Sequence, residues 1–579
     1  MTHRAMISSA APGGRADRRS PAWVLLYGVV TAGLILLFCM ITAGIAWRRL
    51  IYAPYAGLWL VRLLPLALLL AAAATFALLL RELGLAPRTL AWAGQLSGGW
   101  RRNSGLAAAV AVLLSLVVVW VLRAFPNSGD EYAYLWMART FLAGRADNPL
   151  PPVPDLFALA QTGFFGSRWL AVYNPGWPAL LAGGIKAGLP AWLICPLCGG
   201  VLLLAAGILG YRRSGPLGAL LAVALIGFSP FFLFNAGSYF THVPAAAAGL
   251  LFCWQAARFI ARPQAGSAAL CGAALGVLGL IRAADAGIFA LPFAIELLWR
   301  AGRRHYRRVP LIGLAGLPFL AALLAYNRLT TGAVLPHFPA MAQSIRFGAS
   351  PVAVQNSFGV LAPRLLLALS RLVALAEWSS PLLALAAGAA FVSLAWHRRL
   401  SFIDLVFPLF VMAYLVVPFD GGNQYGPRYY FEAFPCLVLT LVAWLAPLLD
   451  ERSRRAALAW FSLAAHGAIC ALVFAFLCVG MRRVVDQRMD LYDQVRAQHL
   501  HQAVVIVQSG TGSIYKMYPP DLVRDGIDAR ADVLYVLDVP DHLPQLQQLY
   551  PRRQFYIYRR EAGRPTGALR PYRLSAARG

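Results

Sequence analysis

Long apolar runs separated by short polar segments recur through most of the chain, and they constrain the fold more than any other feature. Many of them exceed about 18 residues, the length that a helix needs to cross a hydrocarbon core of about 30 Å. The mean hydropathy is +0.62, and only 13% of the residues are charged. We therefore predict a mainly α-helical, polytopic membrane bundle of about 13 spans, at residues 23–46, 56–80, 104–124, 190–210, 216–233, 243–261, 266–281, 285–299, 309–327, 380–396, 402–418, 431–449 and 456–480.

Arginine placement predicts the orientation of these spans. The formal net charge is +27, but the basic residues form short clusters between apolar runs. This pattern is typical of topology signals and argues against a nucleic-acid-binding face. Most clusters, such as Arg212–Arg213 and Arg398–Arg399, fall on one side, which we assign as cytoplasmic, whereas Arg48–Arg49 does not fit. We expect the amino terminus inside, the carboxy terminus outside and no cleavable signal peptide.

The predicted topology places several polar stretches on the outer face, at residues 125–189, 234–242, 328–379, 419–430 and from 481 onward. Within them, the spacing of apolar residues predicts a surface helix at 131–143. Residues 175–189 and 364–377 are too short to cross comfortably and predict helices that dip into the membrane and return.

The carboxy-terminal segment has a different pattern. "AVVIVQ", "DVLYVLDV" and "QFYIYR" are typical of strands, and "HLPQLQQLYP" between the last two is typical of a helix. We therefore expect three parts. Residues 1–103 hold a tail and two accessory spans, residues 104–480 form the transmembrane core with the outer loop 125–189, and residues 481–579 form a small extracytoplasmic α/β domain.

An acidic pair, Asp130–Glu131, follows directly on a predicted span. One interpretation is structural, because the dipole at a helix amino terminus favours negative charge. The other is catalytic, because a partly desolvated carboxylate at the membrane boundary can act as a general base. Sequence spacing alone leaves the two interpretations even.

A second polar feature is "NAGSYFTHVP", which places Tyr239 and His242 in a turn between two spans. A lone histidine at a membrane edge is usually an interfacial residue. Within reach of Asp130, however, His242 could orient the acid or share its proton.

Two arginines, Arg282 in "GLIRAADAG" and Arg428 in "GGNQYGPRYYFEA", lie at the outer edges of spans and apart from the cytoplasmic clusters. Arginine at this depth can extend to lipid headgroups, which is the simpler interpretation. It can equally bind a lipid-linked phosphate through a bidentate contact.

Aromatic and polar residues of the outer segments are candidates for substrate binding. Sugars stack on aromatic faces, although a belt of Tyr and Trp at the membrane interface is the default explanation. The candidates are Tyr173, Tyr239, His337, Tyr425 and Tyr429.

Taken in order, these motifs resemble the GT-C superfamily of integral-membrane glycosyltransferases, in the branch of protein O-mannosyltransferases and aminoarabinose transferases. The resemblance covers most of residues 104–579. It rests on "SGDEYAYLWMARTFLAGR", "YNPGWPALLAGG", "NAGSYFTHVPAAAAGLLF", "GLIRAADAG", "AYNRLTTGAVLP", "GPRYYFEAFPCL" and the final "LQQLYPRRQFYIYRR".

The resemblance implies transfer of a sugar from a polyprenyl-phosphate carrier to a lipid, glycan or protein acceptor, on the outer face of a bacterial inner membrane. It implies that Asp130 deprotonates the acceptor, with Glu131 as its neighbour and His242 assisting. Arg282 and Arg428 are then the candidates for stabilising the phosphate leaving group, and inversion at the anomeric carbon is expected.

One departure from the family concerns metal binding. Many members carry a second acid in the second outer loop, where this chain offers His242 without an adjacent Asp or Glu. We therefore expect no cofactor and a metal-independent reaction, with a divalent metal as the alternative. The eight cysteines all lie in apolar segments, and the pair Cys195 and Cys198 is interpreted as structural.

Two other function classes stay open from the sequence. A transporter or flippase of lipid-linked sugars should carry charges near the midplane of its spans. A scaffold for cell-envelope assembly would use residues 481–579 to bind partners.

Overall fold

The computed structural model describes residues 21–44, 59–85, 95, 98–300, 302–335, 361–416, 424–451, 453–508, 521–528, 530–560 and 566–573. The helices are α1 (Pro21–Gly44), α3 (Trp59–Glu82), α5 (Trp100–Val121), α6 (Gly129–Leu142), η2 (Pro154–Phe157), α7 (Gly176–Lys186), α8 (Ala191–Gly227), α9 (Pro230–Ala236), α10 (His242–Ala261), α11 (Ala265–Ile281), α12 (Ala283–Arg300), α13 (Arg303–Tyr306), α14 (Val309–Thr331), α16 (Leu361–Trp378), α17 (Pro381–Trp396), α18 (Phe402–Val416), η4 (Arg428–Tyr430), α19 (Phe434–Asp450), α20 (Arg454–Ala497) and α21 (Leu543–Leu549).

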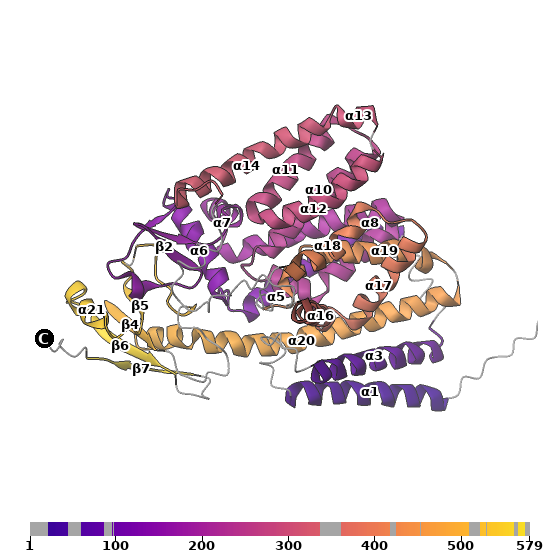
Figure 1. Cartoon of the computed structure of the whole chain (residues 1–579). Helices are drawn as coiled ribbons and strands as arrows, with labels where there is room; N and C mark the ends of the chain where they lie inside the picture. The colour runs from indigo at the N-terminus through magenta and orange to yellow at the C-terminus, as the bar shows by residue number, and fades with distance from the viewer. Residues whose placement is uncertain are drawn as a thin grey trace, which may run out of the picture.

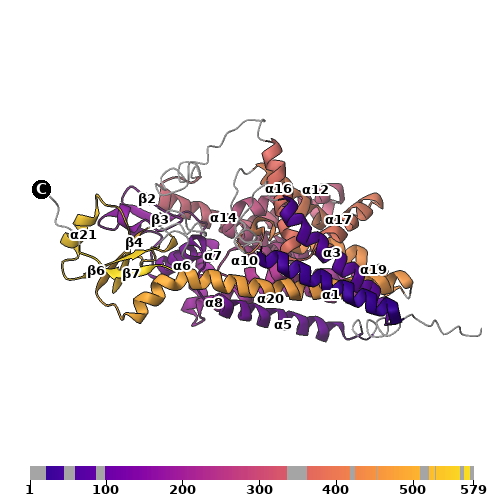
Figure 2. The same cartoon turned by 90° about the horizontal axis from the view of Figure 1, so that it is seen from below.

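The strands form two small sheets at one end of an elongated helical bundle (Figures 1 and 2). The first sheet, in the order β1-β3-β2, is antiparallel and consists of β1 (Asn148–Pro149), β2 (Thr162–Phe165) and β3 (Arg168–Ala171). The second sheet, in the order β5-β4-β6-β7, consists of β4 (Ala503–Gln508), β5 (Val533–Leu537), β6 (Gln554–Arg559) and β7 (Ala568–Pro571).

All thirteen predicted spans coincide with helices, which differ in length and apolar character. In the described part of the chain, seven helices are long and apolar enough to cross a membrane, or eight if the bent pair α16–α17 is one span. Three further apolar helices, α11, α18 and α19, are shorter. A multi-pass membrane protein is therefore supported, whereas the count of 13 and the orientation stay predictions.

Helix α8 contains a reversal that accounts for two of the predicted spans. Ser214 and Gly215 have non-helical backbone angles, with φ of 67° at Gly215. Gly210 and Gly218 face each other so closely that a Cβ on either would meet the carbonyl of the other. Residues 191–227 are therefore a hairpin of two helical arms, as the separate spans 190–210 and 216–233 predicted.

The outer loop 125–189 contains more than the predicted helices. Helix α6 covers the residues of the predicted surface helix, but most of its residues are buried, because it packs against the carboxy-terminal strands. Helix α7 covers the residues of the predicted dipping segment. The sheet β1-β3-β2 between them was not predicted, because strands of two to four residues are too short to show a period-2 pattern. Residues 364–377 are helical as predicted, and α16 bends by 120° into α17.

Three of the four carboxy-terminal strands, β4, β5 and β6, lie where the sequence predicted them, whereas β7 was not predicted. Strand β4 pairs in parallel with β5 and β6, and α21 makes the crossover between those two strands. Residues 503–507 of β4 are all buried, as expected for a central parallel strand. The predicted boundary at 480/481, however, falls inside the 44-residue helix α20, which runs along the bundle to the second sheet (Figure 1).

One hydrophobic cluster joins the outer loop to the second sheet. Trp136 of α6 packs on Trp169 of β3, with ring centroids 5.0 Å apart. The same cluster includes Val504 and Leu534 of the second sheet. Helix α6 is therefore fixed between the bundle and the carboxy-terminal strands.

Candidate active site

Helix α6 carries Asp130 in its first turn. The Oγ of Ser128, the N-cap residue, accepts a hydrogen bond of 3.2 Å from the backbone N–H of Glu131. A Cβ at Gly129 would lie 2.5 Å from the Cβ of Ala160 and 2.6 Å from Oδ1 of Asp521. Only glycine therefore fits where the loop and the carboxy-terminal segment meet the start of the helix.

Asp130 is held by two donors. The hydroxyl of Tyr173 donates to Oδ1, and Nη2 of Arg428 lies 2.8 Å from Oδ2. Both side chains of the ion pair are largely buried, with 16% of Asp130 and 10% of Arg428 exposed. Burial by itself would raise the pKa of Asp130, but the charge of Arg428 and the Tyr173 hydrogen bond hold it below its ordinary value. These two partners therefore favour the ionised form of Asp130.

Arg428 reaches this position through a tight turn. Gly426 has a φ of 91°, and a Cβ there would lie 2.7 Å from the ring of Phe231. The guanidinium of Arg428 also lies over the ring of Phe240, 4.3 Å from its centroid.

A second charged group surrounds Arg282, the residue that follows α11. Its Nε lies 3.0 Å from Oε1 of Glu432 and also donates to Asp285, and its Nη2 donates to the hydroxyl of Tyr414 at 2.8 Å. The same Oε1 of Glu432 lies 2.7 Å from Nδ1 of His242. His242 is 2% exposed and Glu432 is fully buried, so the network is closed to bulk solvent on these sides.

The ring of Tyr429 connects the two groups. The guanidinium carbons of Arg282, Arg371 and Arg428 lie 5.8, 5.7 and 5.7 Å from its centroid. The ring stacks on Tyr414 at 5.2 Å. Carboxylates able to accept a proton and guanidinium groups able to bind phosphate are therefore contiguous around one aromatic face.

Six of the predicted site residues come together in this arrangement: Asp130, Tyr173, His242, Arg282, Arg428 and Tyr429. They derive from the outer loop, the start of α10, the end of α11 and η4. Sequence reasoning grouped them by topological side, and the structure brings them into direct contact.

Glu131 and Tyr239 connect the chain segments that surround the site. Glu131 is fully buried; Oε1 accepts from the backbone N–H of Tyr239 at 3.1 Å and Oε2 accepts from the Ser128 hydroxyl at 3.1 Å. Burial raises the pKa of Glu131 to about 7. Tyr239 donates from its hydroxyl to the carbonyl of Ala124, and its own carbonyl accepts from Trp177 Nε1. Both residues thus fasten the start of α6 to the turn before α10.

The last two candidates are Tyr425 and His337. Tyr425 is fully buried between Phe234 and Phe240, and its carbonyl accepts from Nδ2 of Asn235 at 3.0 Å. His337 lies outside the residues that the structure describes.

Sequence reasoning missed Glu432, Asp285 and Arg371. The second outer loop holds no acid beside His242 in the sequence, but Glu432 contacts His242 from 190 residues further along the chain. The i, i+3 spacing of Arg282 and Asp285, and an acid at the start of the apolar run "FEAFPCL", were the available signals. Within the described residues, no group of three or more His, Cys, Asp or Glu side chains has the arrangement of a metal site.

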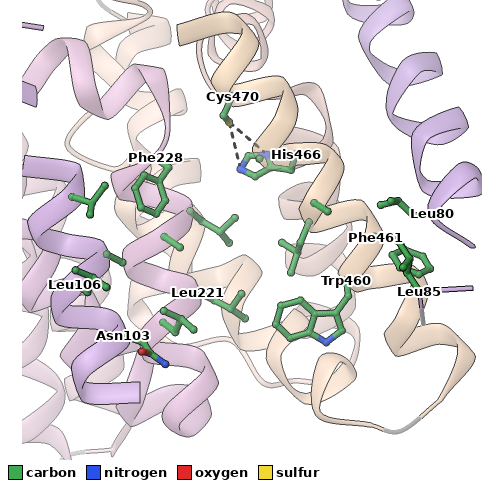
Figure 3. Close-up of a pocket in the computed structure, with 18 residues that line it drawn as sticks. Leu80, Leu85, Asn103, Leu106, Leu221, Phe228, Trp460, Phe461, His466 and Cys470 are labelled. Carbon is green, nitrogen blue, oxygen red and sulfur yellow. Dashed lines mark hydrogen bonds between the residues drawn. The ribbon is translucent and has the colours of Figure 1, made fainter. Parts of the chain in front are cut away.

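A separate apolar cavity of about 690 Å³ lies between α3, α5, α8 and α20 (Figure 3). Its wall consists mainly of aliphatic and aromatic side chains such as Leu106, Leu221 and Phe228, and its polar members include the neighbouring His466 and Cys470. None of the predicted site residues lines it.

The chain matches no protein-family model and no curated protein. Several solved structures are similar in fold. ArnT from Cupriavidus metallidurans bound to undecaprenyl phosphate is 12% identical over 78% of this chain and 92% of its own, with a TM-score of 0.47. The Archaeoglobus fulgidus oligosaccharyltransferase in the apo form is 12% identical over 78% and 69%, with a TM-score of 0.44. Arabinofuranosyltransferase AftD from Mycobacteria is 17% identical over 79% and 35%, with a TM-score of 0.41.

Proposed function

We propose that this chain is a GT-C-type membrane glycosyltransferase that moves a sugar from a polyprenyl-phosphate carrier to an acceptor on the extracytoplasmic side. The observation that carries the proposal is the pairing of Asp130 with Arg428 beside the network of Arg282, Glu432 and His242. A base and phosphate-binding cations at one end of a bundle of apolar helices are what transfer from a lipid-linked donor requires.

The reaction is a single displacement. The acceptor hydroxyl or amine loses its proton to Asp130, and its lone pair forms the new bond to the anomeric carbon. The bond between that carbon and the phosphate oxygen breaks, and the polyprenyl phosphate leaves with the electron pair. Attack opposite to the leaving group inverts the anomeric configuration. General-base catalysis of this kind contributes about 10² to 10⁴ in rate.

Arg428 couples donor binding to the strength of the base. Paired with Arg428, Asp130 is ionised but weakly basic, because its pKa is lowered. A donor phosphate offers Arg428 a bidentate partner. When Arg428 turns toward it, Asp130 loses a counter-charge and its proton affinity rises. The base thus becomes effective with the donor in place.

Arg282 provides the second phosphate contact. Glu432 and Asp285 fix the direction of its guanidinium, and His242 in turn holds Glu432. Preorganised cations stabilise the charge that develops on the leaving phosphate without reorganising during the reaction. The Tyr429 ring between the arginines offers a face on which the sugar can stack.

The test uses the full-length protein in detergent with a set of synthetic undecaprenyl-phosphate sugars and extracted envelope lipids and glycans as acceptors. Released undecaprenyl phosphate and the acceptor mass report transfer. We expect Asp130→Asn to lower the rate by about 100-fold or more, and the matched variant Asp147→Asn, in the same outer loop, to keep it.

Two results would overturn the proposal. Transfer at the parent rate by folded Asp130→Asn would remove Asp130 as the base. Movement of a lipid-linked sugar across vesicle membranes, with no transfer product in detergent, would make the protein a transporter. Transport needs a membrane between two compartments, which a detergent micelle does not provide. Mass spectrometry of envelope glycans from cells with and without the protein identifies the sugar and the acceptor.

A further inference from the structure

A basic cavity lies at the end of α10 opposite to His242. Helix α10 has 20 residues and is therefore about 30 Å long, which separates this cavity from the proposed active site. The cavity measures about 500 Å³ and is lined by Arg212, Arg258, Ala261, Arg262 and Gln264. No carboxylate is among these lining residues.

A neighbouring cavity of about 380 Å³ shares Arg212 with the first. Its basic members also include Arg213 and Arg300, and Glu296 is the acid in its wall. The remaining wall is largely apolar and contains Leu209, Ala257, Ile260, Ala261, Phe402 and Ile403. A basic lobe therefore continues into a lobe with an apolar side.

The carboxylates near the two cavities are already paired. Glu296 lies 3.3 Å from Nε of Arg300, and Asp404 lies 2.8 Å from Nη2 of Arg213. Asp404 also accepts from the Thr440 hydroxyl at 2.8 Å. These pairs compensate Arg300 and Arg213, although Nη1 of Arg213 is buried with no hydrogen-bond partner in the described part of the chain.

The three arginines of the first cavity have no acidic partner among the described residues. Arg258 donates to Oε1 of Gln255, a neutral acceptor, at 3.3 Å. Arg212 and Arg262 are exposed. Three positive charges without compensation around one cavity attract an anion.

The fold assembles this cavity from separate parts of the chain. The reversal at Ser214 and Gly215 presents Arg212 and Arg213 at the tip of the α8 hairpin, while Arg258 and Arg262 come from the end of α10. A preference for arginine on the cytoplasmic side explains their number. It does not explain their convergence on a cavity without a carboxylate.

We propose that this pair of cavities binds an anionic phospholipid of the adjoining leaflet. The phosphate lies between Arg212, Arg258 and Arg262, which can each donate two parallel hydrogen bonds to it. An acyl chain follows the apolar wall formed by Leu209, Ile260 and Phe402. A free phosphate compound would use the basic lobe alone, so the adjoining apolar wall favours a lipid.

The test is lipid binding by the intact protein, measured by native mass spectrometry after release from vesicles of phosphatidylglycerol and phosphatidylcholine. We expect retained phosphatidylglycerol. The triple variant Arg212→Gln, Arg258→Gln, Arg262→Gln should bind it about 100-fold more weakly, since each basic residue near an anionic surface contributes about a factor of five. Arg262→Gln alone, at the exposed end of the helix, should show a smaller loss.

The matched control is Arg398→Gln, Arg399→Gln, a basic pair that lines neither cavity. If this control lost as much phosphatidylglycerol affinity per removed charge as the triple variant, the lipid would be held by general attraction to a basic surface, and the proposal would be overturned. The lipid assignment would be overturned if millimolar inorganic phosphate displaced phosphatidylglycerol and the protein did not retain phosphatidylglycerol in preference to phosphatidylcholine. A thermal transition equal to that of the parent protein establishes that the triple variant is folded.

Discussion

Oε1 of Glu432 lies between two cationic or ionisable partners, 2.7 Å from Nδ1 of His242 and 3.0 Å from Nε of Arg282. One carboxylate oxygen thus links the start of α10 to the end of α11. His242 is part of a buried polar network, and the interpretation of it as an isolated interfacial residue is wrong.

Removing the charge of Glu432 should disorder Arg282 more than it disturbs the fold. We expect Glu432→Gln to lower kcat for sugar transfer by about 10- to 100-fold, because Arg282 loses a charge-assisted partner that fixes its direction. Kinetics with varied donor concentration measure the effect. Glu296→Gln, at the opposite end of α12, is the control and should keep the parent kcat; an equal loss there would contradict a role specific to Glu432.

Arg428 should control both donor affinity and the pH profile. We expect Arg428→Gln to weaken binding of undecaprenyl phosphate by about 10-fold or more. The pKa of Asp130 should rise, because the positive charge that lowers it is gone. The acidic limb of the pH–rate profile should therefore move to higher pH.

The control for this pH experiment is Arg168→Gln in the outer loop, where the side chain is 44% exposed and lies 3.6 Å from Asp147. Its profile should match that of the parent. An unshifted acidic limb in Arg428→Gln would show that Arg428 does not set the charge state of Asp130.

Buried Glu131 should make the stability of the protein depend on pH. Its pKa is raised from 4.5 to about 7, so its contribution to stability is fully present below pH 4.5 and is lost as the pH rises through 7. We expect Glu131→Gln to remove this decline and to be more stable than the parent at pH 8, by up to roughly 3 kcal/mol.

Thermal unfolding in detergent between pH 4 and pH 8 would measure the effect of Glu131→Gln. Asp541→Asn, which changes an exposed carboxylate on the turn before α21, is the control and should follow the parent curve. A parallel decline in Glu131→Gln would assign the pH dependence to other groups.

Gly129 should not tolerate a side chain. The Cβ of Gly129→Ala would lie too close to Ala160 and Asp521, so we expect a loss of about 1–3 kcal/mol in the free energy of unfolding and weaker undecaprenyl phosphate binding as α6 shifts. Gly183→Ala in α7, where a Cβ meets nothing within 4 Å, is the control and should be neutral or stabilising. Equal stability of the two variants would contradict the close packing at Gly129.

Most of the correctly predicted helices and strands were recognised from local sequence patterns. Thirteen apolar segments and three carboxy-terminal strands were predicted correctly as helices and strands, because the period or length of each apolar pattern indicates its secondary structure. The short strands β1, β2, β3 and β7 were not found, because a strand of two to four residues is too short to show a period-2 pattern. The boundary at 480/481 was placed where the apolar run ends, but α20 continues, since a helix can leave an apolar environment without ending.

The sequence by itself determined the helical bundle and three strands of the carboxy-terminal segment, and it selected Asp130, Arg282 and Arg428 as candidates, because hydrophobic periodicity and the placement of charges are local properties. Only the tertiary structure decided that Arg428 pairs with Asp130 and that His242 contacts Glu432, which is distant in the sequence. It also decided that Glu131 accepts a hydrogen bond from the backbone of Tyr239. The physical reason is that these contacts join residues that are far apart in the chain and separated by whole helices, and their geometry depends on how those helices pack.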